Sequence, residues 1–270
     1  MTLSVCVAGV TGWTGSAVAQ GVLDADDLRL VSGVSRTAAG TDLGRAWGGE
    51  ANDVPVFSTV AEALDGVEVL IEYTSHETVR ENTLHAIEHG VSVVVGSSGL
   101  TADDYDEIDR AAHRREVAVL AAGNFSMTAA VAQAAALLAA KFLPSWEIID
   151  YASEAKPDAP SGTARQMAEA LAAVRAPHVE VAVGETAGLL AARGGTLGGA
   201  QVHSVRLPGF VLSTEVVFGL PDERLVIRHD AGTSAEPYVA GTLLATRSTP
   251  HRIGLTRGLA QLLLEADSSD

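Results

Sequence analysis

Residues 3–15 are Leu3-Ser4-Val5-Cys6-Val7-Ala8-Gly9-Val10-Thr11-Gly12-Trp13-Thr14-Gly15, and this stretch decides the fold of the first half of the chain. Its first six residues form an apolar run of strand length, and glycines at i, i+3 and i+6 follow directly. A glycine turn lets the backbone approach a pyrophosphate, and the helix N-terminus behind it offers free N–H groups and a favourable dipole. The pattern GxxGxxG therefore predicts a dinucleotide site; a tight strand-to-helix turn without a ligand is the alternative.

The end of the second strand decides which nicotinamide cofactor is expected. Residues 33–36 are Gly-Val-Ser-Arg, so no Asp or Glu is present to hold the ribose hydroxyls. Ser35 and Arg36 suit a 2′-phosphate instead, because a guanidinium offers a bidentate fork to phosphate oxygens. We therefore predict NADPH rather than NADH, the alternative being that Arg36 is a plain surface charge. The expected cofactor-binding residues of this part are Gly9, Thr11, Gly12, Trp13, Thr14, Gly15, Ser35 and Arg36.

The rest of the first half alternates apolar runs of strand length with segments of helical periodicity. Continuous apolar strands between helices indicate a parallel sheet covered on both faces, and right-handed crossovers make it doubly wound. The strands are expected at 3–10, 28–35, 67–74, 91–98 and 116–123, with helices at 17–25, 76–90 and 102–115. We assign residues 1–123 to a Rossmann-type α/β domain.

The pattern changes after residue 124. An Ala-rich stretch at 127–142 predicts a buried helix, and several strands then follow one another in sequence, which favours a mixed or antiparallel sheet. We expect residues 124–232 to form a second α+β domain that binds substrate and makes oligomer contacts. The segment 233–270 is expected to return to the first domain, with a helix at 236–249. The expected elements of the second domain are strands at 145–153, 200–207, 212–220 and 223–230, a helix at 164–174 and a mobile glycine-rich loop at 192–200.

Composition narrows the classes of function. The 270 residues carry a net charge of −16, which would repel nucleic acid. No apolar run approaches the roughly 18 residues that span a bilayer, and the start has no basic segment typical of a secretory signal. Cys6 is the single cysteine and falls in the first apolar run, so a reducing cytoplasm is the expected location. The histidines are dispersed, and no metal site is expected.

A second motif, Lys156-Pro157-Asp158-Ala159-Pro160-Ser161-Gly162-Thr163, precedes the helix expected from Ala164. A Ser-Gly-Thr turn at a helix start presents N–H groups and hydroxyls in one concavity, which suits a carboxylate. Asp158 and Ser161 could instead be ordinary helix N-caps. Lys156 is one of two lysines among 18 basic residues, which indicates that an ammonium able to move a proton is wanted here.

These motifs together resemble the 4-hydroxy-tetrahydrodipicolinate reductase (dihydrodipicolinate reductase) family of lysine biosynthesis, and the resemblance runs nearly end to end. Besides the glycine turn and Lys156–Ala164, it is carried by Glu72-Tyr73-Thr74, Val95-Gly96-Ser97-Ser98-Gly99, Asn124-Phe125-Ser126, Val202–Arg206 and Ile227–Asp230. It implies an NADPH-dependent reductase, a carboxylate-bearing small-molecule substrate and a homotetramer built through the second domain's sheet.

The resemblance also assigns residues. Ser161, Gly162 and Thr163 would hold a substrate carboxylate, with Lys156 beside the reacting centre. The nicotinamide would lie by Thr74, Gly96, Ser98, Asn124 and Phe125.

One departure from the family pattern bears on catalysis. The family has Glu-x-His-His-x-x-Lys where this chain has Asp150-Tyr151-Ala152-Ser153-Glu154-Ala155-Lys156, so both histidines, the first of them the family's proton donor, are absent. Losing a general acid costs about 10²–10⁴ in rate. Lys156 is then the favoured acid, with Tyr151 and Glu154 as alternatives. Three hypotheses follow: the family reaction, reduction of a different imine, or a non-catalytic NADPH-binding protein.

Overall fold

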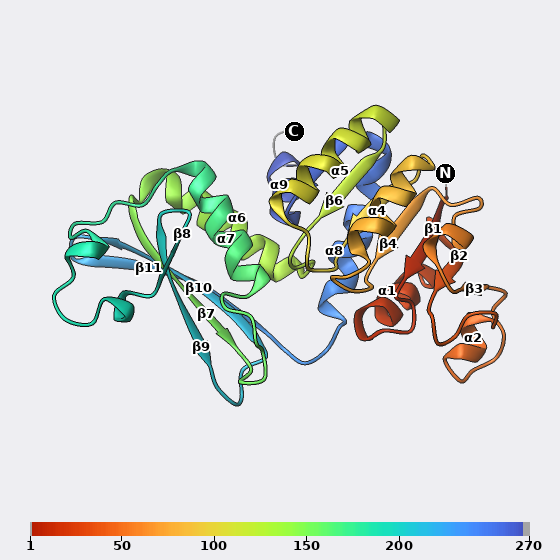
Figure 1. Cartoon of the computed structure of the whole chain (residues 1–270), viewed down its shortest axis with the longest axis horizontal. Helices are drawn as coiled ribbons and strands as arrows, with labels where there is room; N and C mark the ends of the chain where they lie inside the picture. The colour runs from red at the N-terminus through yellow and green to blue at the C-terminus, as the bar shows by residue number, and fades with distance from the viewer. Residues whose placement is uncertain (1, 267–270) are drawn as a thin grey trace. The chain divides into compact units, whose positions relative to one another are not determined.

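The computed structural model of the chain describes residues 2–266, which form two compact units (Figure 1). Unit 1 comprises residues 2–127 and 235–262, and unit 2 comprises residues 128–234 and 263–266. Unit 2 is thus inserted into unit 1 along the chain. The division expected at residues 123 and 232 differs from this one by a few residues, and residues 263–266, which were expected in the first domain, belong to unit 2 instead.

Unit 1 is built on a seven-stranded sheet in which every pair of neighbouring strands is parallel. The order is β12-β6-β5-β4-β1-β2-β3. The chain therefore starts in the middle of the sheet and winds outward in both directions, which confirms the doubly wound fold. The strands are β1 (Leu3–Ala8), β2 (Leu28–Val34), β3 (Val56–Phe57), β4 (Val69–Glu72), β5 (Ser92–Val95), β6 (Ala118–Ala121) and β12 (Gly254–Arg257).

Helices cover both faces of this sheet. One face packs on α3 (Val60–Ala63), α4 (Val79–Glu88) and α5 (Ala102–Arg115), and the other on α1 (Trp13–Leu23) and α8 (Pro237–Ser248). The tail helix α8 thus returns to the first domain as predicted. The shorter elements of the unit are α2 (Leu43–Ala46) and the 3-10 turn η3 (Thr249–His251), while α9 (Leu259–Ala266) follows β12.

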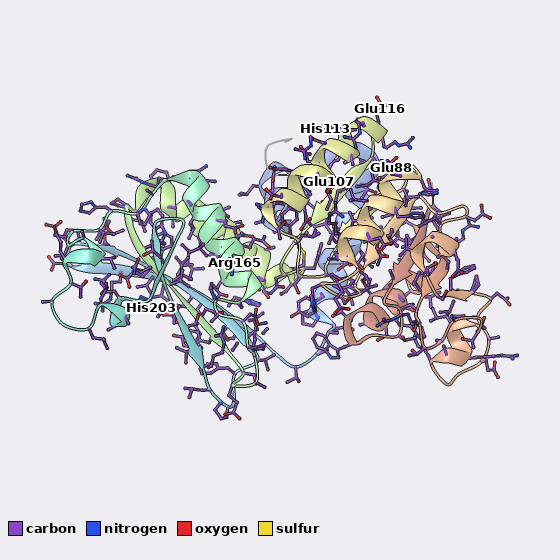
Figure 2. All side chains as sticks on the ribbon, in the orientation of Figure 1. Glu88, Glu107, His113, Glu116, Arg165 and His203 are labelled. Atoms are coloured by element: carbon purple, nitrogen blue, oxygen red, sulfur yellow. The ribbon has the colours of Figure 1, made fainter. Side chains whose placement is uncertain are left out.

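Local chemistry fixes where α5 begins and ends. The Thr101 side chain accepts from the backbone N–H of Asp104, and the Asp104 carboxylate accepts from the N–H of Thr101, a reciprocal capping box. The helix ends at Glu116, whose φ of 55° is left-handed. Ion pairs on the solvent side join α5 to α4: Arg80 pairs with Glu107, and Arg115 with Glu88. The two glutamates, Glu88 of α4 and Glu107 of α5, are labelled in Figure 2. These exposed pairs hold the two helices side by side at little net gain in stability.

Unit 2 is built on a mixed sheet in the order β11-β10-β7-β9-β8. Only β7 and β9 run parallel; the other neighbours are antiparallel. One face packs on α6 (Met127–Phe142) and α7 (Gly162–Val174), around Trp146, Ile148 and Phe218. The strands are β7 (Ser145–Ala152), β8 (Gly195–Leu197), β9 (Ala200–Arg206), β10 (Leu212–Leu220) and β11 (Glu223–Ala231), and the 3-10 turns are η1 (Val183–Glu185) and η2 (Leu190–Arg193).

Two expectations for unit 2 are wrong in detail. The segment at 192–200 is not simply a loop, because it contains β8, which pairs with β9 through a turn at Gly198 and Gly199, both at positive φ. The helix at 127–142 is buried on one face only. Val131, Leu138 and Phe142 are 57%, 55% and 73% exposed, because a single sheet covers only the opposite stripe of this helix.

Candidate functional site

The glycine turn in unit 1 brings three backbone segments into close contact. Gly9 has a φ of 84°, and a Cβ there would lie 2.1 Å from the carbonyl oxygen of Tyr73. A Cβ at Gly15 would lie 2.1 Å from the carbonyl oxygen of Gly9. Helix α1 starts at Trp13 without a side-chain cap, so its first-turn N–H groups face the turn without a capping oxygen. This side-chain-free cradle before free N–H groups fits a pyrophosphate.

The predicted 2′-phosphate residues lie at the end of β2. The hydroxyls of Thr11 and Ser35 are 2.7 Å apart, so the glycine turn and the end of β2 are joined by a hydrogen bond. Arg36 is exposed and has no ion-pair or hydrogen-bond partner among residues 2–266. Trp13 is 58% exposed, with its ring edge-to-face against Tyr238 at a centroid distance of 5.8 Å. The structure thus brings the turn and the 35–36 pair together.

The five residues expected near the nicotinamide all belong to unit 1 and follow three neighbouring strands. Thr74 comes after β4, Gly96 and Ser98 after β5, and Asn124 and Phe125 after β6. Carboxyl ends of adjacent parallel strands meet at one edge of a sheet, where ligands bind in open α/β sheets. Two side-chain atoms here are buried with no hydrogen-bond partner among the described residues, Nδ2 of Asn124 and the hydroxyl of Ser97. Such orphaned groups are typical of a site that a polar ligand completes.

The Tyr73 ring packs against residues at this edge of the sheet. A Cβ at Gly96 would lie 2.1 Å from the Tyr73 ring, and Phe125 packs edge-to-face on it at 6.2 Å. The Tyr73 hydroxyl lies 2.9 Å from that of Thr242 on α8. Burial raises the pKa of Tyr73 well above its ordinary range, so the phenol stays neutral.

Glu72 is a buried carboxylate that the sequence did not single out as a site residue. It is 0% exposed, and its Oε1 accepts from the backbone N–H of Thr74 at 3.3 Å, from the Thr74 hydroxyl and from Nδ2 of Asn82 at 3.2 Å. Its Oε2 is buried without a partner in the described part of the chain. An acid ending an otherwise apolar strand was the available signal.

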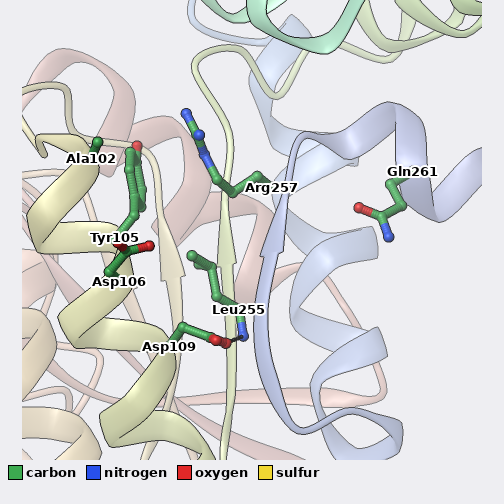
Figure 3. A pocket seen from close by; sticks show the side chains of 7 residues that line it. All are labelled: Ala102, Tyr105, Asp106, Asp109, Leu255, Arg257 and Gln261. Carbon is green, nitrogen blue, oxygen red and sulfur yellow. Dashed lines mark hydrogen bonds between the residues drawn. The ribbon is translucent and has the colours of Figure 1, made fainter. Parts of the chain in front are cut away.

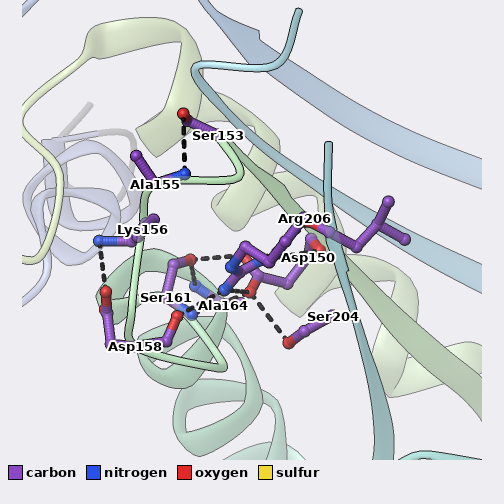
Figure 4. Close-up of polar contacts among 10 residues, drawn as sticks. Asp150, Ser153, Ala155, Lys156, Asp158, Ser161, Ala164, Ser204 and Arg206 are labelled. Carbon is purple, nitrogen blue, oxygen red and sulfur yellow. Dashed lines mark hydrogen bonds and ion pairs between the residues drawn. The ribbon is translucent and has the colours of Figure 1, made fainter. Parts of the chain in front are cut away.

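In unit 2, the Lys156–Thr163 motif forms a turn that leads into α7 (Figure 4). Ser161 is the N-cap: its hydroxyl oxygen accepts from the N–H of Ala164 at 3.3 Å and donates to Oδ1 of Asp150 at 2.6 Å. The N-cap alternative is therefore confirmed for Ser161, and α7 begins at Gly162 rather than at Ala164. The hydroxyl of Thr163 is buried with no partner among the residues described. Gly162 is exposed.

A buried ion pair lies behind this turn and was not predicted. Asp150 is 0% exposed; its Oδ2 accepts from the N–H of Ser161 at 2.9 Å, from the Ser204 hydroxyl at 3.1 Å and from Nη2 of Arg206 at 2.8 Å. Burial alone would raise the pKa of Asp150, but the hydrogen bonds from Ser161 and Arg206 outweigh it, and the pKa is lowered. The pairing joins strands 56 residues apart, which no local sequence pattern reveals.

The three candidate acids occupy different places. Nζ of Lys156 lies 2.9 Å from Oδ1 of Asp158, inside the motif. Tyr151 lies on the opposite face of β7 from Asp150, stacked on Phe210 at 5.0 Å, and burial followed by the charge of Glu215 raises its pKa. The sheet thus separates Tyr151 from the turn.

The third candidate acid is Glu154, and Ala152 lies two residues before it. Glu154 is exposed, and Ala152 is 0% exposed on the Asp150 face of β7.

Each of the two units has a cavity. In unit 2, the turn residues Ala159 and Pro160 line a cavity of about 480 Å³ together with Arg165 and Ser204. In unit 1, a cavity of about 360 Å³ lies beside α5 and β12, where the Arg257 guanidinium is 4.2 Å from the centre of the Tyr105 ring (Figure 3). None of the predicted site residues lines the latter.

Residues 2–266 contain no group of three or more His, Cys, Asp or Glu side chains placed to hold a metal ion. Across the same range, no helix has both the length and the apolar character needed to cross a membrane.

Comparison with known proteins finds a matching family and similar relatives along nearly the whole chain. The family description "Dihydrodipicolinate reductase, N-terminus" matches residues 3–125, and "Dihydrodipicolinate reductase, C-terminus" matches residues 123–263. The 4-hydroxy-tetrahydrodipicolinate reductase of Lactococcus lactis subsp. cremoris is 37% identical over 263 residues, which cover 97% of both chains. That of Moorella thermoacetica is 37% identical over 270 residues, covering 97% of this chain and 98% of the relative.

A solved structure, the dipicolinate-bound dihydrodipicolinate reductase from Paenisporosarcina sp. TG-14, is also similar. It superposes with a TM-score of 0.78 at 28% identity, covering 97% of this chain and 99% of that one.

Proposed function

This chain belongs to the dihydrodipicolinate reductase family, and we propose that it catalyses the NAD(P)H-dependent reduction of 4-hydroxy-tetrahydrodipicolinate in lysine biosynthesis. One observation carries the proposal: in a chain that matches the reductases over 97% of its length, the glycine cradle and the Lys156–Thr163 turn are both in place. The chain is an oxidoreductase, as the sequence predicted.

NADPH is the proposed preferred cofactor. Its support is the exposed Arg36, which has no partner within residues 2–266, next to the hydrogen-bonded hydroxyls of Thr11 and Ser35. A guanidinium with free N–H groups beside two hydroxyls matches the chemistry of a 2′-phosphate. When bound, the nicotinamide supplies a hydride. Thr74, Gly96, Ser98, Asn124 and Phe125 are proposed to contact its ring, supported by the unpartnered Nδ2 of Asn124.

The substrate carboxylate is proposed to bind at the start of α7. Gly162 and Thr163 offer first-turn N–H groups with the positive end of the helix dipole, and the Thr163 hydroxyl has no partner in the described structure. The Ser161 hydroxyl is committed to Asp150, so its contribution is to shape the turn and to accept from Ala164.

Lys156 is proposed as the proton donor in place of the absent histidine pair. Ala152 has no acidic proton, Tyr151 lies on the other face of the sheet, and Glu154 is exposed and precedes the motif. The Lys156 ammonium lies within the motif and is the acid that we favour. Little proton donation is needed where an imine nitrogen arrives already protonated.

The missing pair also supports a second candidate function, reduction of a related cyclic imine. The third hypothesis, a non-catalytic NADPH-binding protein, is not supported, because such a protein has no use for a carboxylate-binding turn.

A homotetramer in the cytoplasm is proposed with this function. The face of the mixed sheet opposite α6 and α7 carries Val226, which is 50% exposed, and the ion pair of Arg228 with Glu215 at 3.3 Å. An open sheet face with exposed apolar groups is typical of an oligomer contact. The reduced thiol of buried Cys6 suits a reducing compartment. Light scattering after size-exclusion chromatography measures the oligomer; a monomer would contradict it.

The direct test mixes the protein with NADPH and the substrate generated in situ by its upstream synthase. Loss of nicotinamide absorbance is followed, with an established reductase of the family as the positive control. Turnover within about a hundredfold of the control, the lower bound for loss of one general acid, supports the proposal. No turnover in a sample that binds NADPH tightly would contradict it and favour another imine.

A further inference from the structure

Arg206 on β9 connects to both halves of the Lys156–Thr163 motif. Its Nη2 donates to Oδ2 of Asp150 at 2.8 Å and to the backbone carbonyl of Asp158 at 2.7 Å. Asp150 in turn accepts from the N–H and the hydroxyl of Ser161, the N-cap of α7. The Asp158 carboxylate pairs with Nζ of Lys156 at 2.9 Å. The Arg206 guanidinium is therefore linked to the start of α7 through Asp150, and it is linked to Lys156 through Asp158.

The geometry points to Arg206 as a positioning residue, which holds the carboxylate-binding turn and Lys156 in register with each other. This inference rests on the proposed function of that turn. Arg206 contacts neither Lys156 nor the proposed carboxylate-binding residues Gly162 and Thr163: it acts through the Asp150 side chain and the Asp158 backbone, so it is not a catalytic residue.

Burial makes this connection strong and directional. The Arg206 side chain is 17% exposed and Asp150 is 0% exposed, so water competes little for their hydrogen bonds. Nη1 of Arg206 also donates to the backbone carbonyl of Val205 at 2.9 Å, which fixes the plane of the guanidinium. Because Arg offers several donors in a rigid fork, lysine reproduces the charge but not the set of bonds.

The turn has little else to hold it. Ala159, with Pro160, lines the cavity of about 480 Å³ on one side, and Asp158 is exposed to solvent. Within residues 2–266, the side chains that bond to the segment 157–163 from outside it are those of Asp150, Lys156 and Arg206. Displacing a positioned binding group by about 1 Å can cost on the order of 10²-fold. Loss of Arg206 should therefore weaken carboxylate binding without affecting the cofactor unit.

The test measures dipicolinate binding by calorimetry on the full chain, with NADPH affinity measured on the same samples. Arg206→Met is expected to raise the dipicolinate Kd about 10- to 100-fold and Arg206→Lys about three- to tenfold, with the NADPH Kd unchanged. The matched control is Arg193→Met, which breaks an arginine–carboxylate pair with Glu147 on the same strand β7. It should leave the dipicolinate Kd at the wild-type value.

Wild-type dipicolinate affinity in folded Arg206→Met would overturn the inference, as would an equal loss in Arg193→Met. If Arg206→Met does not fold, Arg206→Lys decides by the same criterion, provided its Tm is within a few degrees of wild type. Wild-type protein that binds dipicolinate but does not turn over the substrate defeats the proposed function alone. Failure of the wild type to bind dipicolinate defeats both.

Discussion

Replacing Gly9 by alanine tests the close backbone contact between the glycine turn and Tyr73 in the proposed cofactor site. The new Cβ would lie 2.1 Å from the Tyr73 carbonyl oxygen, whereas ordinary van der Waals contact begins at 3.4 Å, so the two backbones must separate. Gly9 also has a φ of 84°, which an L-residue adopts at a cost of about 1–2 kcal/mol. Overpacking adds about 1–3 kcal/mol. Gly9→Ala should therefore destabilise unit 1 by about 2–5 kcal/mol before the small entropic gain from alanine.

Gly40→Ala is the matched control for this substitution. Gly40 has a φ of 78° and nothing within 4 Å of its would-be Cβ, so the control carries the conformational cost without the clash. The difference between the two variants in free energy of unfolding isolates the close approach and should be about 1–3 kcal/mol.

The assay is urea unfolding followed by far-UV circular dichroism, with NADPH titrated by fluorescence on the same proteins. Gly9→Ala should also weaken NADPH binding, because separating Gly9 from Tyr73 opens the turn; Gly40→Ala should not. Equal destabilisation by the two variants would refute the reasoning, since it would mean that the contact between Gly9 and Tyr73 imposes no constraint.

Other predictions test single groups. Arg36→Ala should raise the NADPH Kd about 10- to 100-fold, the loss of a charge-assisted hydrogen bond, and leave the NADH Kd unchanged; Arg45→Ala is the control, and unchanged NADPH preference would contradict the assignment. Lys156→Met should lower kcat by about 10²–10⁴ at unchanged NADPH affinity; near-normal turnover would exclude it as the acid.

Two more concern titrating groups. Since folding lowers the pKa of Asp150, its stabilisation is present above the unfolded pKa and lost as pH falls through the folded one. The deficit of Asp150→Asn in urea, about 3–5 kcal/mol at pH 7, should thus shrink below about pH 4; a pH-independent deficit would contradict this. Burial raises the pKa of Cys6 to about 12, so iodoacetamide at pH 8 should label it only in denaturant, and rapid native labelling would contradict its burial.

Much of the fold could be predicted because its signals are local. Helices α5 and α6 span the ranges expected, Ala102–Arg115 and Met127–Phe142. Apolar residues at three- and four-residue spacing mark α5, and an Ala-rich stretch marks α6. Strand β3 was missed because two residues give too short a pattern to recognise, and β12 because its sequence, Gly-Leu-Thr-Arg, contains no apolar run of the kind that marks β4, β5 and β6. Strand β8 was taken for a loop because its glycines also suit a hairpin turn.

The candidate site also has parts that local sequence motifs predict and parts that depend on tertiary packing. The glycine turn and the Ser161 turn each lie within a few consecutive residues, so spacing alone indicates them. The Asp150–Arg206 pair depends on β7 and β9 lying side by side, which is a property of the sheet and not of either segment. Glu72 was visible in the sequence, but its full burial and its bonds to Thr74 and Asn82 depend on how β4 and α4 pack.

The insertion of unit 2 into unit 1 orders the events of synthesis. Strand β12 pairs with β6, yet more than a hundred residues of unit 2 separate them along the chain. At about 5–20 residues per second, a ribosome delivers β12 on the order of ten seconds after β6. During that interval the nascent sheet has an open parallel edge at β6, while the five strands of unit 2 are made one after another and are complete before β12. The five-stranded sheet of the inserted segment can thus pair its strands before the sheet of its host is closed at β12.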